Sequence, residues 1–330
     1  MNIYSLVIPV YNRPEEIDEL LGSLLNSHFK NFEVIIVEDG SQRKCEQIIE
    51  KYQHKLDIKY TYQDNTGPGP ARNNGAKSAT GEYIIFLDSD VIVPENYLEI
   101  INKDLSKNST DCFGGPDKDH PSFTKTQKAI NYSMTSTLTT GGIRGSQENF
   151  DKFYPRSFNL GIKKSVFEEM NGFSEMRFGE DLDLSMRIIE KGFQTKLIRD
   201  AFVYHKRRNN YRSFFKQVFN SGIARINLEL KHPKTLKLVH TLPSVFVIYL
   251  AITLIISIFW WPVTALLLLP AILFFIDALA RTRELVTSAL GVIAVYTQLI
   301  GYGSGFIKAF VLRIVLKKKE FHNFEQTFYK

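Results

Sequence analysis

Cysteine is scarce in this chain, whose 330 residues contain only Cys45 and Cys112. Two cysteines are too few for a disulfide framework or a zinc site, and a reducing compartment is the simplest inference. The N-terminus lacks a charged stretch followed by an apolar core, so we expect no secretory signal and a first domain that stays in the cytoplasm. Repeats and low-complexity tails are also lacking. No RNA- or DNA-binding motif accompanies the net charge of +6, so nucleic acid is not an expected partner.

The first part of the chain alternates between strand-like and helix-like stretches. Apolar runs cover 5–12, 32–37 and 58–62, and helical patterns begin at Glu15 and, after the second run, continue to about Lys55. Strands that alternate with helices predict an α/β fold with a mostly parallel, doubly wound sheet. Sheets of this kind bind ligands beyond the carboxyl ends of their strands.

Acidic residues follow two of the apolar runs. Asp39 comes after the run at 32–37, and Asp88 and Asp90 end the run at 83–91. Because side chains alternate along an extended strand, Asp88 and Asp90 point the same way and are suited to one divalent ion. Oxygen ligands favour Mg²⁺ or Mn²⁺, and such an ion neutralises charge on a departing diphosphate. A turn with two solvated acids is the alternative. Asp39 is suited to accept from the ring N–H of uracil or guanine, or to cap the next helix.

The segment 65–73 reads Asn-Thr-Gly-Pro-Gly-Pro-Ala-Arg-Asn. Its glycines resemble a phosphate-binding loop, but Pro68 and Pro70 have no backbone N–H, and the spacing is not Gly-x-Gly-x-x-Gly. We therefore reject a dinucleotide-binding fold and expect a stiff loop that carries Arg72 and Asn73 toward the site. A plain surface position for Arg72 is the alternative.

Polar side chains at the ends of three later elements are further candidates. Glu180 and Asp181 open an amphipathic helical pattern, where a carboxylate stays ionised and ready to accept a proton, although complementarity to the helix dipole explains the same placement. His205 follows a short strand and is either a metal ligand or a structural histidine. Asn159 is either a contact for an acceptor or part of an ordinary turn.

Several of these segments, taken in order, resemble family 2 glycosyltransferases with the nucleotide-sugar-binding GT-A fold. The matching segments are 7–12, 37–41, 65–73, 88–90 and 179–187, and the resemblance ends near residue 200. It implies a donor site, a metal site for Mn²⁺ or Mg²⁺, a catalytic base and an acceptor side. The donor site would be formed by Pro9, Tyr11, Asp39, Arg72, Asp88 and Asp90. The metal would be bound by Asp88, Asp90 and His205. Asp181, beside Glu180, would be the catalytic base, and Asn159 would lie on the acceptor side. One departure is Glu38, where many members have aspartate.

The composition changes sharply after His240. The stretches 242–261, 262–280 and 285–316 are long and apolar, which predicts two or three membrane segments. The first two meet at an uncharged aromatic turn at 260–262, which suits a hairpin tip outside the cell. The third contains Gly301-Tyr302-Gly303-Ser304-Gly305, where we expect a break and a re-entrant or interfacial segment, although its topology stays open.

Basic residues set the expected orientation. Lys231, Lys234 and Lys237 precede the first span, and Arg281 and Arg283 follow the second, so both ends of the hairpin should be cytoplasmic. The stretch 211–230 has an amphipathic pattern that suits either the membrane interface or packing against the globular domain. We therefore divide the chain into a GT-A domain (1–210), an interface or linker helix (211–238) and a membrane domain (239–330).

The resemblance and the membrane segments together predict a metal-dependent, inverting glycosyltransferase of the cytoplasmic membrane. It would move a sugar from a nucleotide-sugar donor, with UDP-sugars favoured, to a lipid-linked saccharide for a cell-surface polysaccharide. Transfer to a polyprenyl phosphate, and a catalytically silent scaffold that binds nucleotide sugars, are the alternatives. A processive polymerase is less favoured, because no Gln-x-x-Arg-Trp motif follows the expected base.

Overall fold

The structure, a computed structural model, describes residues 3–141 and 153–319. The described chain forms two compact units. The N-terminal unit comprises residues 3–120 and 153–205, and the helical unit comprises residues 121–141 and 206–319. The boundaries expected at 210 and 238 stay predictions. The grouping of 121–141 with the later helices is new, since nothing in the sequence pattern indicated it.

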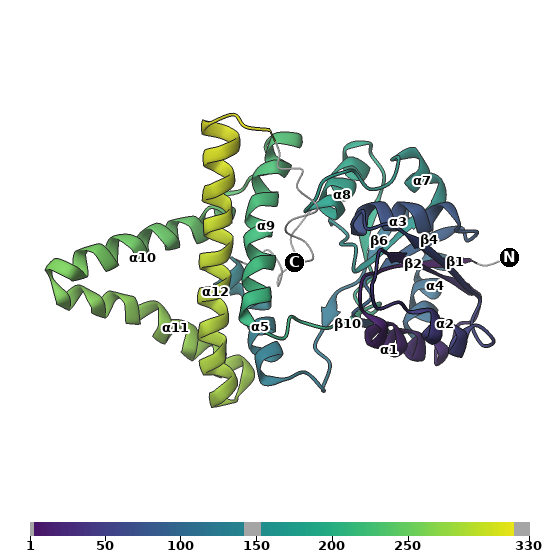
Figure 1. The fold of residues 1–330 in the computed structure, drawn as a ribbon, viewed down its shortest axis with the longest axis horizontal. Coiled ribbons are helices and arrows are strands. Elements are labelled where there is room, and N and C mark those ends of the chain that lie inside the picture. The colour runs from purple at the N-terminus through teal and green to yellow at the C-terminus, as the bar shows by residue number, and fades with distance from the viewer. Residues whose placement is uncertain (1–2, 142–152, 320–330) are drawn as a thin grey trace. The chain divides into compact units, whose positions relative to one another are not determined.

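A seven-stranded sheet with the order β3-β2-β1-β4-β8-β6-β9 forms the centre of the N-terminal unit (Figure 1). Its strands are β1 (Tyr4–Val10), β2 (Phe32–Asp39), β3 (Ile58–Gln63), β4 (Tyr83–Leu87), β6 (Cys112–Gly114), β8 (Asn159–Lys163) and β9 (Thr195–Leu197). Strands β1 to β4 are parallel, whereas β8 runs antiparallel to its neighbours β4 and β6. A smaller sheet joins β5 (Val91–Ile92), β10 (Val203–His205) and β7 (Asp117–Lys118). The predicted mostly parallel α/β sheet is confirmed.

Helices cover both faces of the seven-stranded sheet. They are α1 (Pro14–Leu25), α2 (Glu46–Tyr52), α3 (Pro68–Lys77), α4 (Tyr97–Lys107), α7 (Lys164–Glu169) and α8 (Glu180–Glu190). Side chains alternate along β1, so that Leu6 and Ile8 pack with α1, α2 and α4, whereas Val7 packs with α3, α7 and α8. The parallel strands β1, β2 and β4 end at the same edge of the sheet, and the predicted acidic residues follow two of them.

The segment 65–73 is not the stiff loop that we expected. Gly67 (φ 97°) precedes α3, and both prolines fall in the first turn of this helix. Proline is tolerated there because its missing N–H would have no partner inside the helix. Gly75 lets α3 lie against β1, since a Cβ at this position would approach Val7 Cγ1 to 2.5 Å. Arg72 is therefore carried by a rigid helix.

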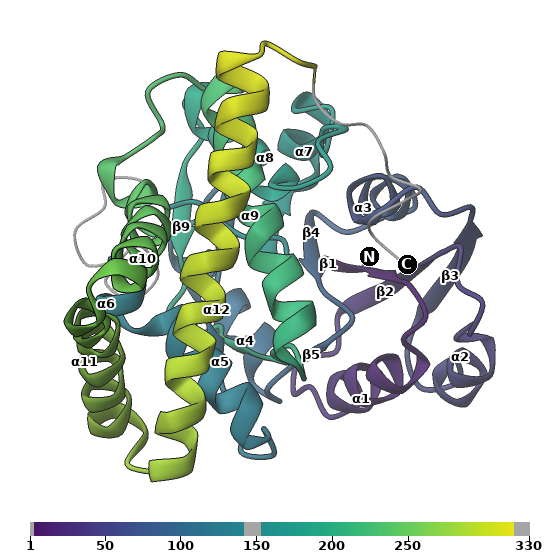
Figure 2. The ribbon, with the colours of Figure 1, turned by 60° about the vertical axis from the view of Figure 1, so that its left-hand side comes forward.

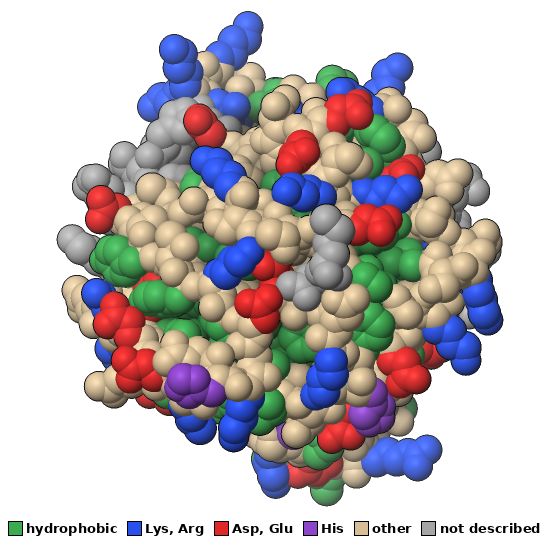
Figure 3. All heavy atoms as spheres, turned by 90° about the vertical axis from the view of Figure 1, so that its right-hand side faces the viewer, with side chains coloured by type: hydrophobic (Ala, Val, Ile, Leu, Met, Phe, Trp, Pro, Cys, Tyr) green, Lys and Arg blue, Asp and Glu red, His purple; other side chains and the backbone are tan. Residues whose placement is uncertain are grey.

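Basic and acidic side chains are intermingled on the face of the molecule that Figure 3 shows. Opposite charges also pair at the surface of the N-terminal unit, for example Lys51 with Asp18 at 2.8 Å. The net positive charge is therefore not gathered into one broad patch on this face.

The helical unit contains the stretches that were predicted to enter a membrane. Its elements are α5 (Lys125–Thr135), α6 (Thr137–Thr140), α9 (Tyr211–Lys231), η2 (Leu238–His240), α10 (Leu242–Phe259), η3 (Trp261–Thr264), α11 (Ala265–Thr282), α12 (Leu285–Ala309) and the π-helical η4 (Phe310–Val315). Leu242–Phe259, Trp261–Thr282 and Leu285–Val315 are long and apolar enough to cross a membrane. Helices α10 and α11 form a hairpin (Figure 1).

The expected break at 301–305 is wrong, because α12 continues through these residues. The glycines instead allow close helix packing. A Cβ at Gly301 would approach Val218 Cγ2 to 2.6 Å, and a Cβ at Gly305 would approach the Phe219 carbonyl oxygen to 2.0 Å. Both neighbours belong to α9, so small residues on α12 let the two helices pack closely.

Candidate active site

Asp88, Asp90 and His205 form a compact group after β4. One ligand atom from each residue lies within 4.8 Å of the other two. His205 Nε2 lies 3.2 Å from Asp90 Oδ1 and 3.9 Å from Asp88 Oδ2. Two carboxylates and an imidazole are donors that Mn²⁺ and Mg²⁺ accept. The three residues predicted as metal ligands are thus close together and fit a divalent ion.

The two aspartates converge for a different reason from the predicted one. Strand β4 ends at Leu87, and residues 88–90 form a turn before β5. Alternation along a strand therefore does not apply to them. Strand β10 pairs antiparallel with β5, which places His205 opposite Val91 and beside the turn. The small second sheet brings the histidine to the aspartates.

Two arginines bind these carboxylates. Arg13 Nη1 donates to Asp90 Oδ2. Arg72 is 3% exposed, and its Nη2 donates to Asp88 Oδ1 at 2.7 Å while its Nη1 donates to Glu180 Oε1 at 3.1 Å. Arg72 therefore links the turn after β4 to the start of α8. The sequence analysis placed Arg72 in the site but did not name Arg13, because no local pattern in the sequence indicates that Arg13 pairs with Asp90.

Helix α8 begins with two buried acids. Arg156 Nε donates to Asp181 Oδ2 at 2.6 Å. Burial would raise the pKa of Asp181, but the charge and hydrogen bond of Arg156 outweigh it and lower this pKa. Burial, and next the charge of Asp181, raise the pKa of Glu180. Asp181 is thus held as a carboxylate, the state that a general base requires. Arg156 was not predicted either.

Asp39 is 2% exposed, and both of its carboxylate oxygens accept hydrogen bonds. Oδ1 accepts from Gln63 Nε2 at 2.8 Å and from Thr66 N at 2.9 Å, and Oδ2 accepts from Gly67 N at 2.8 Å. Asp39 therefore fixes the chain that leads into α3. Asp39 thus has a structural role, and its contact with the nucleobase stays a prediction.

Pro9 and Tyr11 lie at the end of β1, where Pro9 is opposite Val37 of β2. Asn12 ties the following turn to the loop after β2, because its backbone N donates to Ser41 Oγ at 2.8 Å. Both predicted donor residues thus lie at the edge of the sheet where β1 and β2 end. A contact between either of them and a nucleotide stays a prediction.

Asn159 begins β8 and is 1% exposed. Its Oδ1 accepts from Tyr97 Oη at 2.6 Å, and its Nδ2 donates to the Ala201 carbonyl oxygen at 2.8 Å. Its amide is therefore engaged inside the core. The acceptor contact that was predicted for Asn159 stays a prediction.

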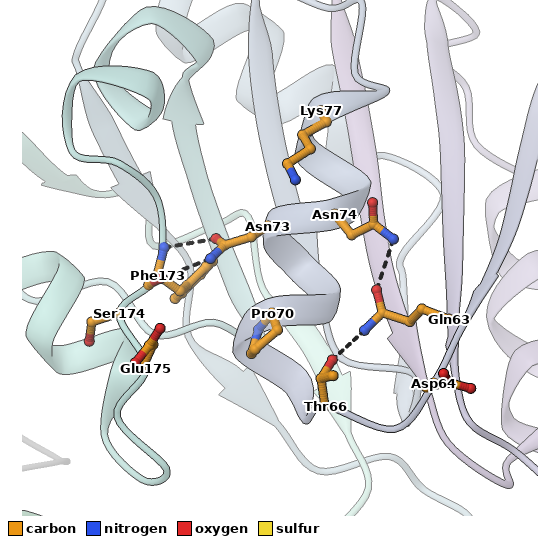
Figure 4. Close-up of a pocket in the computed structure, with 10 residues that line it drawn as sticks. All are labelled: Gln63, Asp64, Thr66, Pro70, Asn73, Asn74, Lys77, Phe173, Ser174 and Glu175. Atoms are coloured by element: carbon orange, nitrogen blue, oxygen red, sulfur yellow. Dashed lines mark hydrogen bonds between the residues drawn. The ribbon is translucent and has the colours of Figure 1, made fainter.

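A pocket of about 410 Å³ lies beside α3, between this helix and the loop that contains Phe173 (Figure 4). Asn73, which the sequence analysis expected near the site, lines this pocket, whereas the residues predicted for the donor, metal, base and acceptor roles do not. Asn74 Nδ2 donates to Gln63 Oε1 at 2.8 Å, and Gln63 Nε2 donates to Thr66 Oγ1 at 2.6 Å. Since Gln63 also donates to Asp39, a chain of side-chain amides connects the pocket wall to Asp39.

Comparison with known proteins gave matches at both the sequence and the structure level. The chain is 25% identical over 216 residues to the uncharacterized glycosyltransferase EpsJ of Bacillus subtilis strain 168, covering 63% of this chain and 62% of that protein. It is 38% identical over 110 residues to the poly(ribitol-phosphate) beta-N-acetylglucosaminyltransferase TarS of Staphylococcus aureus strain Mu50, covering 32% of this chain and 18% of that protein. The chain therefore spans less than two thirds of the length of either relative.

Among solved structures, the fold is similar to that of the mannosyltransferase PcManGT from Pyrobaculum calidifontis in complex with GDP-Man and Mn²⁺. The TM-score is 0.68 at 15% identity, and the match covers 93% of this chain and 86% of that one. The N-terminal unit is thus a GT-A-like α/β domain. The model of glycosyl transferase family 2 matches residues 5–170. Since this is half of the sequence, the chain belongs to glycosyl transferase family 2.

Proposed function

We propose that the protein is a metal-dependent, inverting glycosyltransferase of the hexosyltransferase type. It takes a sugar from a nucleotide-sugar donor, with UDP-sugars favoured, and transfers it to a hydroxyl group of a lipid-linked saccharide. One observation carries the proposal: Arg72 joins the Asp88 carboxylate to Glu180, so a group fit for a metal and diphosphate lies beside the ionised Asp181.

The donor end consists of Asp88, Asp90 and His205, which would hold Mn²⁺ or Mg²⁺ together with the donor diphosphate. The bound ion would neutralise charge on the leaving nucleoside diphosphate. Arg13 and Arg72 hold the two aspartates in place by charge-assisted hydrogen bonds. Pro9, Tyr11 and Asp39 would bind the nucleoside where β1 and β2 end.

Asp181 would act on the acceptor. Its carboxylate takes the proton of the acceptor hydroxyl as that oxygen attacks the anomeric carbon from the face opposite the diphosphate. The bond between this carbon and the diphosphate oxygen breaks, the nucleoside diphosphate leaves, and the proton stays on Asp181. A single displacement inverts the anomeric configuration and needs no covalent sugar intermediate.

The acceptor class rests on the helical unit and on the relatives. Three apolar stretches are suited to a membrane, and the basic residues that flank 242–282 favour placing both ends of the hairpin, and the catalytic unit, on the cytoplasmic face. The name of TarS describes transfer to poly(ribitol-phosphate), which supports a surface polymer or its lipid-linked precursor as acceptor.

Nucleotide release by the detergent-solubilised full-length protein tests this proposal. A panel of nucleotide sugars is supplied with Mn²⁺ or Mg²⁺, or with a chelator, and membrane lipid extract serves as acceptor. We expect metal-dependent release that Asp90→Asn and Asp181→Asn both abolish. Asp200→Asn, at an exposed acid, is the matched control and should release nucleotide like the wild type. Donor binding without release from any mixture would instead indicate a silent scaffold.

A second candidate, transfer to a polyprenyl phosphate, is favoured by Arg156. This arginine is 40% exposed while it pairs with Asp181, so a phosphate acceptor has a cation within reach and needs no strong base. The same assay with polyprenyl phosphate separates the two functions. Full activity of Asp181→Asn combined with loss of activity in Arg156→Gln would favour the phosphate acceptor.

A further inference from the structure

The three apolar stretches of the helical unit differ in how much of their surface is covered. In an apolar window of 18 residues from each stretch, 11% of the residues are buried in Leu242–Phe259 and 17% in Trp261–Thr282, against 39% in Leu285–Val315. Exposed apolar side chains occur all round the α10–α11 hairpin, for example Ile258 at 78% and Leu268 at 62%. Helices that are apolar on every side require lipid around them. This condition holds for the hairpin but not for α12.

Helix α9 accompanies α12 along its whole length. Tyr211 Oη donates to the Leu290 carbonyl oxygen at 3.0 Å near the start of both helices. Arg313 Nε, in η4 directly after α12, donates to Asn227 Oδ1 at 3.1 Å near the end of α9. Figures 1 and 2 both show the two helices side by side. Whatever depth α12 occupies in a membrane, α9 must share.

Charges on α9 decide that depth. Lys216 and Arg225 lie within the helix, Arg212 lies in its first turn, and Glu229 and Lys231 lie in its last turn. A charged side chain in the hydrocarbon region is costly, even when it extends toward the headgroups. If α12 crossed the bilayer, α9 would carry at least Lys216 and Arg225 into the hydrocarbon region. A position at the bilayer surface carries no such cost.

The hairpin stands across α12 rather than along it. At the start of α10, Ser244 Oγ donates to the Gly303 carbonyl oxygen at 3.3 Å. Near the end of α11, Ala278 Cβ lies 3.4 Å from where a Cβ on Gly291 would be. These two attachment points are separated along α12 by about 18 Å at 1.5 Å per residue. Figure 1 shows the hairpin projecting sideways from α12, so the two cannot both follow the membrane normal.

We propose that α12 lies in the membrane interface, against anionic lipid headgroups, and that of the described helices only α10 and α11 cross the bilayer. The proposal rests on the membrane attachment proposed above. An apolar stripe recurs every seven residues at Val286, Ile293, Ile300, Ile307 and Ile314. Val286 and Ile293 of this stripe are 52% and 50% exposed.

Basic residues at the far end of α12 suit this placement. Lys308 lies in the last turn of α12, Arg313 lies in η4, and Lys317, Lys318 and Lys319 follow as exposed residues. Anionic headgroups attract such a cluster at the bilayer surface. The consequence is topological: residue 319 lies on the same side of the membrane as the catalytic unit.

Cysteine labelling of the full-length protein in sealed membranes tests this consequence. Single cysteines replace Lys55 on the catalytic unit, Trp260 at the hairpin tip and Lys319 after α12, all of which are exposed. The natural Cys45 and Cys112 are fully buried, so the wild type gives the background. A membrane-impermeant maleimide is applied to right-side-out and to inverted vesicles.

We expect Lys319→Cys and Lys55→Cys to be labelled in the same vesicles and Trp260→Cys in the opposite ones. Labelling of Lys319→Cys on the opposite side from Lys55→Cys would overturn the proposal, because α12 would then cross the bilayer. Labelling of all three on one side would also overturn it, because the hairpin would not cross. The sides are compared with one another, so the result does not depend on the catalytic proposal or on which face is cytoplasmic.

A depth measurement provides a second test. A fluorophore on Ile300→Cys, at the middle of α12, is quenched by nitroxide lipids that carry the label either near the headgroup or near the end of the acyl chain. We expect stronger quenching by the headgroup-proximal label. Stronger quenching by the deep label would refute an interfacial α12.

Discussion

Replacing Arg156 by alanine should move the pH dependence of catalysis. Its Nε lies 2.6 Å from Asp181 Oδ2, and two opposite charges whose centres are about 4 Å apart, as in such a pair, attract by about 4 kcal/mol at an effective dielectric constant of 20. Because the Arg156 side chain is 40% exposed, solvent screening reduces this to about 1–2 kcal/mol. The guanidinium holds the pKa of Asp181 low, so its loss raises that pKa. The base is then protonated over a wider acidic range.

We therefore expect the acid limb of kcat/KM to move to higher pH in Arg156→Ala, with a rate about 5- to 30-fold below wild type at the acidic edge. On the alkaline plateau the two enzymes should differ far less. Arg156→Lys keeps the charge and should remain close to wild type. The measurement is nucleotide release across pH with saturating metal. An acid limb that stays in place in Arg156→Ala, or that moves equally in Arg156→Lys, would refute Asp181 as the base.

Three further predictions concern donor binding, stability and packing. Gln63→Leu removes one hydrogen bond to Asp39, so initial-rate kinetics should show a donor KM about 3- to 10-fold higher with kcat unchanged; an unchanged KM would exclude this link to the donor. Burial raises the pKa of Glu33, but its hydrogen bonds outweigh burial and lower this pKa from 4.5 to about 2. The ionised carboxylate therefore stabilises the folded state fully above pH 4.5, and this contribution is lost as the pH falls toward 2. Thermal unfolding should therefore find Glu33→Gln less stable by up to about 3 kcal/mol at pH 7 but similar to wild type near pH 2, while the exposed Glu82→Gln changes little. Gly305→Ala should cost about 1–3 kcal/mol in detergent, although alanine favours helices, and a higher melting temperature would contradict the close packing of α9 on α12.

Local patterns in the sequence predicted the elements of the N-terminal unit well. The apolar run at 32–37 lies within β2, and the run at 58–62 lies within β3. Glu180 and Asp181 begin α8 as expected. These predictions succeeded because periodicity and helix-start signals depend on neighbouring residues, and the buried parallel strands are almost continuously apolar.

Contacts between residues that are far apart in the sequence could not be predicted from such local patterns. Arg13 and Asp90 are 77 positions apart, and Arg72 and Glu180 are 108 apart. An arginine that follows a strand looks the same in sequence whether it faces solvent or a carboxylate. The glycines at 301–305 were misjudged for a related reason, since glycine suits both a break and a close helix contact, and only the presence of α9 decides between them.

The two acids at the start of α8 illustrate what geometry adds to a motif. In the sequence, only the family resemblance favours Asp181 over its neighbour Glu180 as the base. In the structure, Asp181 accepts from Arg156 and from the Leu182 backbone N–H at 2.8 Å, whereas Glu180 shares Arg72 with Asp88. The pKa of Asp181 is therefore lowered and that of Glu180 raised. Neighbouring acids whose environments separate their pKa values take different roles. Asp181 is the one that remains ionised to receive a proton, and Glu180, which takes up a proton more readily, is suited to holding Arg72 beside the donor end.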